Sequence, residues 1–597
     1  MKKCFTADFE TTTKAEDCRV WAWAICNIDY PEDFRYGNSM EGFMELCEDS
    51  GTNYEFYFHN LKFDGGFIIS WLLHNGFEHV RDVKERKDNT FTTLITDMGQ
   101  FYQITVYFKV TKHYCNKVTF KDSLKIFPNF SVERVAQGFN LPIGKLELDY
   151  ETEREVGHKL TDHEIAYIRN DVEIMARALN IMFDNNLTKM TIAGDAMSSF
   201  KDFQPDWRKI FPKLPLDIDA EIRTAYRGGF TYVNDKYTEK PVGSGIVLDV
   251  NSLYPAMMLK ELPYGKPEFF EGKYQEDLAY PLYIQQLTCD FQIKPDKIPT
   301  IQLHNNLSFM PNEYIKSSKN KRVTLNLTKP DLELFFEHYD VDVYEWNGGW
   351  KFKKRKGVFD DYINYWTEQK IKAAKEGNAP QRQIAKLMLN SLYGRTGLNP
   401  KSRQKYPVLD HDGIVRYVLG EPEEREPVYI PVACFITAYG RCNTIRASQM
   451  IREWSEKKYG VDKYLYSDTD SIHANLTVED LEELKEVMDI DDYKLGYWSF
   501  ESEFDRALFI RQKCYVEEKD GKLNVTVAGL PKYLTPIINF ETFKKGFTTE
   551  GLTREDLIRI AKENGASEEQ IKKLHPKLTY KYVKGGVILA DTDFTIK

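Results

Sequence analysis

The sequence predicts a protein of several domains, of mixed α/β and α+β class. The chain has 597 residues, which is too long for one hydrophobic core, so about three to five structural units are expected. Residues 1 to about 190 alternate strand-like and helical runs, a pattern typical of an α/β domain. Farther along, strand-like, turn-rich and strongly helical stretches follow one another without an internal repeat, which favours α+β units.

The later elements are predicted in chain order. A polar connection near 201–219 leads to SGIVLDVNSLYP (244–255), which has the pattern of a buried strand. A turn-rich stretch over about 261–358 is typical of an inserted subdomain, and two helices are predicted over 359–394 with a turn at NAPQ. The remaining elements are a hairpin over 401–420, a helix over 434–458, a hairpin at KYLYSDTDSIHANL (463–476) and a basic tail.

Composition restricts the class of protein. Apolar residues make up 42% of the chain and no apolar run has the length of a membrane span, so a soluble protein without membrane association is expected. The start, MKKCFTADFE, lacks the apolar segment of a secretory signal. Nine cysteines without a CxxC pair fit reduced thiols better than disulfides or a zinc site.

The net charge of −10 argues against a protein that coats a polyanion with its whole surface. It leaves room for a local basic groove, although each basic cluster taken alone is more often a solvated loop. The clusters are KSSKNKR (316–322), KFKKRK (351–356), KSRQK (401–405) and KKLHPKLTYKYVK (572–584).

A first set of acidic residues begins in ADFETT. Strand spacing directs Asp8 and Glu10 to one face and Phe9 into the core. Two carboxylates on one face repel each other unless a cation lies between them, which suits hard divalent ions such as Mg²⁺. Asn60 with Asp64, and Tyr167 with Asp171, are spaced four apart and are each predicted on one helical face. Alone, a DxE pair is commonly just exposed strand, but three such segments together are more specific.

A second set lies near two predicted strands. Asp249 ends an apolar strand, and Asp468 and Asp470 occupy a hairpin turn. A buried charge costs several kcal/mol unless it is paired or bound to metal. If the strands are neighbours in one sheet, these acids converge where two divalent cations and a triphosphate could offset their repulsion. An ordinary polar hairpin turn is the alternative for SDTDS.

The helix between these strands carries a stripe of cations, an amide and an aromatic ring. The stripe is formed, at spacings of four, four and three, by Arg382, Lys386, Asn390 and Tyr393. Such a stripe suits a nucleotide, because cations meet phosphates and the ring meets the base. Leu387 and Leu392 can anchor the helix, and Lys370 of the preceding helix could join the stripe.

The three N-terminal acidic segments resemble the Exo I, Exo II and Exo III motifs of DEDDy 3′→5′ exonucleases. The resemblance implies a ribonuclease-H-like domain in which Tyr167 orients the attacking water and two metal ions are held by Asp8, Glu10, Asp64 and Asp171. The same resemblance implies a grip on the frayed single strand by Thr11, Asn60, Phe67, Ser123, Leu124, Lys145 and Tyr150, each of which could equally be structural.

The remaining motifs resemble those of family B DNA polymerases, in the right order over nearly the whole chain. They are DVNSLYP (motif A), KLMLNSLYG (motif B), YSDTDS (motif C), YRGG (226–229), TAYGR (437–441) and KCY (513–515). Three positions depart from the pattern: Arg382 stands where lysine is usual, Gly440 replaces alanine and suggests a more flexible segment, and KEGNAP lengthens the turn before the stripe.

This second resemblance implies a role for each matched residue. Asp249 and Asp468 would hold metal, with Asp470 beside them as a third catalytic acid. Tyr254 would exclude a 2′-hydroxyl, and Tyr393 would pack on the nascent base pair. The triphosphate and nucleotide would be bound by Lys370, Arg382, Lys386 and Asn390; the primer end by Lys513 and Tyr515; and the DNA backbone by Tyr226, Gly228, Gly229, Thr437 and Arg441.

The long spacing between motifs A and B resembles that of the protein-primed branch found in small phages with linear genomes. It implies a right-hand polymerase of palm, fingers and thumb with two inserted subdomains, one docking a terminal protein and one acting in processivity and strand displacement. The expected boundaries are 1–190 exonuclease, 191–260 palm, 261–358 first insertion, 359–397 fingers, 398–430 second insertion, 431–527 palm and 528–597 thumb.

Together the resemblances imply a template-directed DNA polymerase with a proofreading 3′→5′ exonuclease. Its expected cofactors are two Mg²⁺ or Mn²⁺ ions per active site, and its expected partners are primer and template DNA, dNTPs and a terminal protein. A monomer working in the host cytoplasm is expected. The alternatives are a family B polymerase that extends nucleic-acid primers, and a non-catalytic DNA-binding protein on the same fold, which the intact acid sets argue against.

Overall fold

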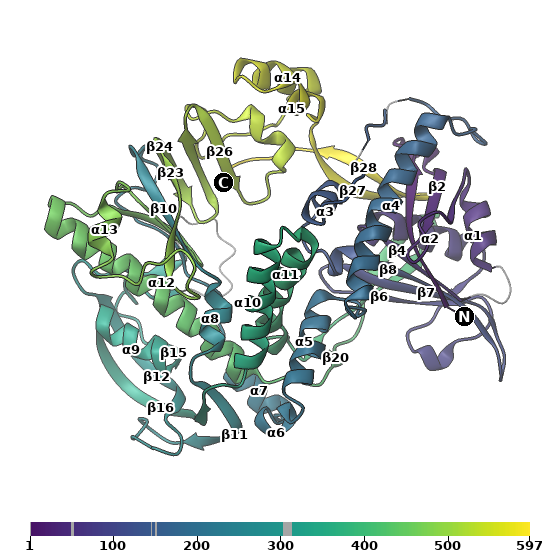
Figure 1. The fold of residues 1–597 in the computed structure, drawn as a ribbon. Coiled ribbons are helices and arrows are strands. Elements are labelled where there is room, and N and C mark those ends of the chain that lie inside the picture. The colour runs from purple at the N-terminus through teal and green to yellow at the C-terminus, as the bar shows by residue number, and fades with distance from the viewer. Residues whose placement is uncertain (1, 49–52, 145, 150–151, 303–312) are drawn as a thin grey trace.

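A computed structural model describes residues 2–48, 53–144, 146–149, 152–302 and 313–597 (Figure 1). An N-terminal α/β domain lies on one side, and the bodies formed by the rest of the chain lie beside it. The yellow hairpin near the end of the chain returns to this first domain, whereas the C-terminus itself lies beside β26, apart from the N-terminus.

The N-terminal domain is built on an eight-stranded sheet with the order β3-β2-β1-β4-β8-β7-β6-β5. Its central strand β1 (Lys2–Thr11) pairs antiparallel with β2 (Val20–Asn27) and parallel with β4 (Asn53–Phe58). The other strands are β3 (Phe34–Gly37), β5 (Glu78–His79), β6 (Thr90–Ile95), β7 (Phe101–Val110) and β8 (Cys115–Asp122). Phe5, Ala7 and Phe9 alternate into the core on one face, as the spacing of β1 predicts.

Helices cover both faces of this sheet: α1 (Met40–Glu48), α2 (Leu61–His74), α3 (Val132–Gly138) and α4 (Asp162–Asp184). Helix α4 packs across β1 and β2, and the Thr6 hydroxyl of β1 donates to the Val172 carbonyl of α4 at 2.7 Å. A capping box of Thr161 and Glu164 fixes the start of α4. The helix therefore holds a defined position over the strand that carries Asp8 and Glu10.

The second body, here called the central sheet, has five strands in the order β23-β10-β22-β21-β9. They are β9 (Thr231–Val233), β10 (Gly245–Val250), β21 (Tyr464–Asp468), β22 (Ser471–Ala474) and β23 (Trp498–Phe504). The short helix α8 (Leu253–Met258) follows β10, and α12 (Ile430–Tyr459) packs against α8 and β21. Most residues in the first half of α12 are buried, so the predicted helix is a core element.

Two helices stand beside the central sheet as a helical hairpin. They are α10 (Asp360–Lys375) and α11 (Ala379–Thr396), and they confirm the helices predicted over 359–394. Leu387 and Leu392 are buried and anchor α11, as expected. Helix α11 also packs on α5 (Ile192–Phe203), which lies in the stretch of chain after the N-terminal domain. Helices α6 (Trp207–Ile210) and α7 (Leu216–Arg223) follow α5 in the chain.

The two stretches expected as insertions fold as compact additions. The first contains a four-stranded sheet of β11 (Leu262–Phe270), β16 (Tyr339–Arg355), β12 (Leu282–Ile293) and β15 (Val323–Thr328), with helix α9 (Lys329–His338). The second carries the hairpin β18 (Lys405–Leu409) and β19 (Val415–Leu419), which confirms the hairpin predicted over 401–420. Tyr417 of this hairpin packs on Phe101 of the N-terminal domain.

The C-terminal part differs from the expected division. Strands β24 (Arg506–Arg511), β25 (Cys514–Lys519) and β26 (Lys522–Val527) share one hydrophobic core with residues of 530–574 and with Phe594 and Ile596. The boundary expected at 527/528 therefore falls inside one core, because Val516 and Val527 pack with Leu534 and Phe594. Helices α14 (Arg554–Glu563) and α15 (Glu568–Lys572) precede the hairpin of β27 (Lys577–Val583) and β28 (Gly586–Thr592), which packs on α2.

Within the described ranges, no helix combines the length and apolar character needed to cross a membrane. Six of the nine cysteines are buried, namely Cys26, Cys47, Cys289, Cys434, Cys442 and Cys514.

Two candidate acidic sites

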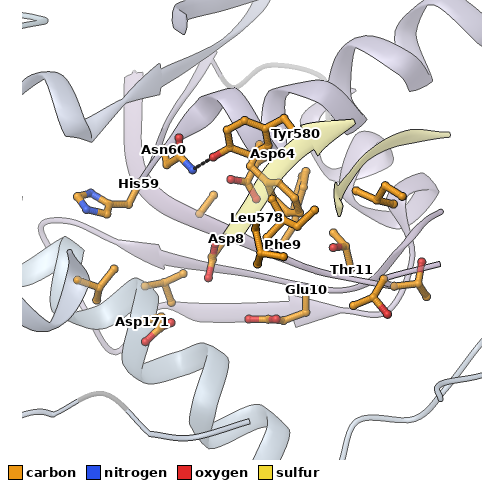
Figure 2. Close-up of a pocket in the computed structure, with 18 of the residues that line it drawn as sticks. Asp8, Phe9, Glu10, Thr11, His59, Asn60, Asp64, Asp171, Leu578 and Tyr580 are labelled. Carbon is orange, nitrogen blue, oxygen red and sulfur yellow. Dashed lines mark hydrogen bonds between the residues drawn. The ribbon is translucent and has the colours of Figure 1, made fainter. Parts of the chain in front are cut away.

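A cavity of about 760 Å³ lies between β1, α2, α4 and the hairpin β27–β28 (Figure 2). It is called the N-terminal cavity below. Strand β1 supplies Asp8 and Glu10 from adjacent same-face positions, α2 supplies Asp64, and α4 supplies Tyr167 and Asp171. All four acids expected to hold metal in this domain, and the expected water-orienting tyrosine, thus line one cavity.

The carboxylate of Asp64 shows that this cavity concentrates negative charge. Asp64 is 3% exposed, and its Oδ1 atom accepts no hydrogen bond from the part of the chain that the structure describes. Burial, followed by the nearby charge of Asp8, raises the pKa of Asp64 well above its usual value. A buried carboxylate oxygen without a donor fits a cation-binding role, because a bound cation would satisfy it.

Asn60 lies differently from the prediction. It is not on a face of α2 with Asp64 but precedes the helix, in the left-handed region with φ 83°. Its backbone N–H donates to Asp122 Oδ1 at 3.0 Å, and its side-chain amide donates to the Tyr580 hydroxyl at 2.8 Å. Both Asn60 and Thr11 nevertheless line the cavity, as expected of residues that meet a strand.

The other residues expected to contact a single strand either do not line this cavity or lie outside the residues that the structure describes. Phe67 is 2% exposed and Ser123 is fully buried, with the Ser123 hydroxyl donating to the Phe58 carbonyl at 3.0 Å. Among the described residues that line the cavity, neither these two nor Leu124 appears, so their contact with a single strand stays a prediction. Lys145 and Tyr150 lie outside the described residues.

One wall of the cavity was not anticipated from the sequence. It comes from the end of the chain and consists of His575, Leu578, Tyr580, Ile588, Leu589 and Asp591. Figure 2 shows Leu578 and Tyr580 on the same side of the cavity as Asp64. The alternation in KLTYKYV indicates a strand, but local periodicity gives no sign of the domain against which that strand packs.

The second acid set lies on the central sheet. Asp249 of β10 and Asp468 of β21 both stand opposite Ser471 of β22, one on either side. Directly opposed residues share a face of the sheet. The two acid-bearing strands therefore lie in one sheet, as expected, but they are not direct neighbours, because β22 lies between them.

The acids of the central sheet line a cleft of about 490 Å³, here called the central cleft, together with Glu501 and Lys513. Burial raises the pKa of Asp249 to about 7, and the charges of Asp470 and Glu501 act in the same direction. Burial also raises the pKa of Asp470, to which Asp468 contributes. Glu501 lies on β23 outside every recognised motif, so no sequence signal identifies it.

Lys513 supplies a positive charge to this acidic cleft. Its Nζ lies 3.0 Å from both carboxylate oxygens of Asp468, and its side chain is 58% exposed. The Tyr466 hydroxyl donates to Asp468 Oδ2 at 3.2 Å and accepts from the Lys513 backbone N–H at 3.1 Å. Tyr515 packs its ring on that of Tyr466, with centroids 5.0 Å apart. KCY and the motif C turn therefore form one hydrogen-bonded unit.

The turn that carries Asp468 and Asp470 is tightly supported. Thr469 has a left-handed φ of 61°, its N–H donates to the Phe230 carbonyl at 2.7 Å, and its carbonyl accepts from the Thr444 hydroxyl at 2.7 Å. A Cβ at Gly229 would lie 2.7 Å from the Thr469 side chain. Gly229 is thus required by close packing beneath the turn, and Gly228 next to it is exposed.

Two residues expected at the DNA backbone are buried instead. Thr437 is 1% exposed and Arg441 is 2% exposed. The Arg441 guanidinium pairs with Asp331 at 2.7 Å and donates to the Gly228 carbonyl at 2.8 Å. Both side chains therefore contact protein in this structure, and the direct DNA contact expected of them stays a prediction. Arg441 holds the YRGG loop, while Tyr226 of that loop is half-buried.

The stripe on α11 faces solvent beside the cleft. Arg382, Lys386 and Asn390 are exposed, and Lys370 on α10 is half-buried. Burial lowers the pKa of Lys370, and the charges of Lys386 and Arg382 lower it further. Three cations therefore converge across the helical hairpin, and the lengthened turn does not separate them.

The aromatic end of the stripe meets the residue expected to exclude a 2′-hydroxyl. The rings of Tyr254 and Tyr393 lie 4.2 Å apart, centroid to centroid. A Cβ at Gly440 would lie 3.3 Å from Tyr254 Cε1, so this glycine leaves room for the tyrosine. Gly440 lies inside α12, so the flexible segment suggested by the sequence is a continuous helix here.

The acids of each site line one cavity, but their carboxylates do not converge on a single position. Among the described residues, no three His, Cys, Asp or Glu side chains form a ready-made metal site. The orphaned oxygen of Asp64 and the raised pKa of Asp249 still fit both sets to divalent cations.

Comparisons with known proteins agree on one family. A family model described as DNA polymerase type B, organellar and viral, matches residues 49–156 and 145–485. The DNA polymerase of Bacillus phage Nf is 42% identical over 617 aligned positions, covering 100% of both chains. The solved phi29 DNA polymerase complexed with primer-template DNA has a TM-score of 0.88 and 40% identity over 100% of both chains. Its ternary complex with incoming nucleotide has a TM-score of 0.87, at the same identity and coverage.

Proposed function

The chain belongs to the type B DNA polymerases, organellar and viral, and from that premise we propose that its two acidic sites divide the synthesis and the trimming of DNA between them. The chain is a template-directed DNA polymerase of this family, which implies divalent cations. The observation that carries the proposal is the separation of two acid sets, one in the central cleft and one in the N-terminal cavity.

In the central cleft, Asp249 and Asp468 would hold two Mg²⁺ or Mn²⁺ ions with Asp470 beside them. The ions, when bound, supply charge stabilisation for in-line attack of a primer 3′-hydroxyl on the α-phosphate. The placement of both carboxylates opposite Ser471 supports this role, because it directs them into one cleft. Lys513 and Tyr515 would hold the primer end, beside the motif C turn to which they are hydrogen-bonded or packed.

The helical hairpin would hold the incoming nucleotide. Lys370, Arg382 and Lys386 would bind the triphosphate, and Asn390 would contact the nucleotide. The convergence of the three cations supports this, because phosphate binding would relieve their mutual repulsion. Tyr254 would exclude a 2′-hydroxyl and Tyr393 would pack on the nascent base pair, which the close contact of their rings supports. Tyr226, Gly228 and Gly229 would lie along the DNA backbone.

In the N-terminal cavity, Asp8, Glu10, Asp64 and Asp171 would hold two cations for hydrolysis of a 3′ end. Tyr167 would orient the attacking water, and Thr11 and Asn60 would contact the single strand. The buried, donor-free oxygen of Asp64 supports cation binding here. The reaction is 3′→5′ exonucleolysis, which would remove mispaired ends left by the polymerase.

The partners follow from the same family membership. We propose primer and template DNA and dNTPs as ligands, since the similar solved structures are described as holding them. Initiation from a terminal protein docked on residues 261–358, strand displacement aided by residues 398–430, action as a monomer and work in the host cytoplasm complete the proposal. Extension of nucleic-acid primers alone is the second candidate, and a deoxynucleotide transfer assay with and without a terminal protein separates the two.

Primer extension on a singly primed circle, with Mg²⁺ and no accessory protein, tests the proposal. Product longer than one circuit is expected, because synthesis must then displace the strand already made. Product that stops at one circuit would contradict strand displacement. No product at all would contradict the synthetic role of the central cleft.

A further inference from the structure

The wall of the N-terminal cavity that comes from the end of the chain carries a tyrosine hydroxyl, and this hydroxyl contacts a residue expected to bind substrate. Asn60 and Tyr580 both line the cavity, and the Asn60 amide donates to the Tyr580 hydroxyl at 2.8 Å (Figure 2). We propose that Tyr580 is a positioning residue of the degradative site, whose hydroxyl holds the Asn60 side chain in the orientation that contacts a single-stranded 3′ end. This inference rests on the exonuclease function proposed above.

Asn60 needs such a partner because of where it stands in the chain. It lies before the first residue of α2, with a left-handed φ of 83°, so the helix does not fix its side-chain rotamer. Its backbone is fixed by the N–H donated to Asp122 Oδ1 at 3.0 Å. The Tyr580 hydroxyl is the partner that the structure gives the side-chain amide.

The Tyr580 ring is itself held from two sides. The Phe63 ring lies 6.2 Å from it, centroid to centroid, and the Lys62 ammonium lies 5.0 Å above its face. Burial raises the pKa of Tyr580, so the hydroxyl keeps its proton near neutral pH. The protonated hydroxyl can accept from Asn60 and still donate one hydrogen bond.

Close contacts that require glycine fix the hairpin that carries Tyr580. A Cβ at Gly586 would lie 2.5 Å from the Phe67 ring, and one at Gly585, whose φ is 95°, would lie 2.3 Å from the Cys18 carbonyl oxygen. Val587 is fully buried in the core of the N-terminal domain. The turn of the hairpin therefore packs on α2 and on Cys18, which precedes β2. Tyr580 thus enters the cavity from a tightly packed hairpin.

This arrangement predicts an effect on binding and little effect on the chemical step. An amide already oriented before the substrate arrives loses less conformational freedom on binding. Among the described residues, no hydrogen bond joins Tyr580 to any of the four acids. Removal of its hydroxyl should therefore act through Asn60 alone. Loss of one neutral hydrogen bond corresponds to a factor of about 2 to 12 in affinity.

The test is Tyr580→Phe, assayed with a labelled single-stranded oligodeoxynucleotide. Binding is followed by fluorescence anisotropy in EDTA, and degradation by single-turnover kinetics in Mg²⁺. A rise of about 2- to 12-fold in Kd and KM is expected, with kcat within about twofold of the wild-type value. Tyr582→Phe is the matched control: Tyr582 lies two residues along the same strand, packs on Tyr417 and is not among the described residues lining the cavity.

A double-mutant cycle with Asn60→Ala decides whether the hydroxyl acts through the amide. Asn60→Ala removes the same hydrogen bond from the other side, so it also serves if Tyr580→Phe folds poorly. The double variant should match Asn60→Ala in KM. Additive effects, an unchanged KM in Tyr580→Phe, or an equal rise in Tyr582→Phe would overturn the inference.

The combined variant Asp8→Ala with Asp171→Ala separates this failure from that of the proposed function. If it still degrades the oligodeoxynucleotide, the exonuclease assignment fails. If it is inactive while Tyr580→Phe has the wild-type KM, only the positioning role of Tyr580 fails.

Discussion

The N-terminal cavity and the central cleft gather carboxylates in different ways. In the cavity, Glu10, Asp64 and Asp171 are each 5% exposed or less, and elements of the sheet, two helices and the C-terminal hairpin surround them. In the cleft, Asp468 has a side chain 19% exposed and pairs with Lys513, whose side chain is 58% exposed. Burial raises carboxyl pKa values at both sites, at Asp64 in the cavity and at Asp249 in the cleft, and the cleft in addition pairs Asp468 with an exposed ammonium group.

This difference has a consequence for how each site depends on the rest of the fold. Asp249 and Asp468 of the cleft stand at one register of the central sheet, so the strands of that sheet set their spacing. The cavity joins segments from β1 to β28. The cleft should therefore tolerate changes at the C-terminal hairpin that the cavity does not.

The largest effect expected is that of Asp468→Ala. It removes a carboxylate from the cleft and leaves the Lys513 ammonium there unpaired, so primer extension should fall by at least about 10⁴-fold. Degradation of a single-stranded 3′ end should stay within about twofold of wild type. Asp492→Ala, an exposed acid near the same sheet, is the control. Loss of both activities in Asp468→Ala would break the separation of the two sites.

The reverse experiment is Asp8→Ala with Asp171→Ala. Degradation should fall by about 10³-fold, somewhat less than in the first experiment because Glu10 and Asp64 remain in the cavity. Primer extension should continue at the wild-type rate. Undiminished degradation in this variant would show that the N-terminal cavity is not the site of degradation.

Tyr254→Val tests which side chain beside the central cleft selects against a 2′-hydroxyl. The ring of Tyr254 packs on that of Tyr393 with centroids 4.2 Å apart, and a smaller side chain would leave space where the sugar is proposed to lie. Discrimination against ribonucleotides, measured as a ratio of kcat/KM values, should fall by about 10- to 200-fold. Tyr439→Phe, which changes a tyrosine on α12 outside the stripe, should leave that ratio unchanged. Equal discrimination in Tyr254→Val and wild type would refute the gate.

Lys513→Gln tests the ammonium of the cleft and has the smallest effect expected. Because Lys513 is exposed, its pair with Asp468 is screened, and extension and primer-template affinity should fall by about 10-fold. The rate of single-strand degradation should not change. Lys519→Gln, at the other end of β25, pairs with Glu503 and Asp505 and serves as the matched control. A loss of degradation in Lys513→Gln would link the two sites.

Local patterns were sufficient to predict much of both sites. The alternation of ADFETT predicts that Asp8 and Glu10 share a face, and both line the cavity. The spacing of Arg382, Lys386 and Asn390 predicts one exposed stripe on a helix, which α11 has. These features depend on the period of a strand or a helix, which neighbouring residues set by themselves.

Features set by long-range packing escaped prediction. Arg441 carries a charge that suggests exposure, yet Asp331 of the first insertion and two backbone carbonyls satisfy it in the core. Asn60 leaves the helix because the backbone adopts a left-handed conformation before α2. The C-terminal hairpin packs on α2 through contacts of Gly586 and Val587 with residues some 500 positions earlier, and no local pattern encodes that pairing.

The central claim is that each of the two acid sets captures divalent cations. Anomalous diffraction from crystals grown with Mn²⁺ tests it most directly, with data recorded at the manganese edge. We expect anomalous peaks in two places, one among Asp8, Glu10, Asp64 and Asp171 and one between Asp249 and Asp468. Peaks absent from either place in crystals that bind Mn²⁺ elsewhere would contradict the account.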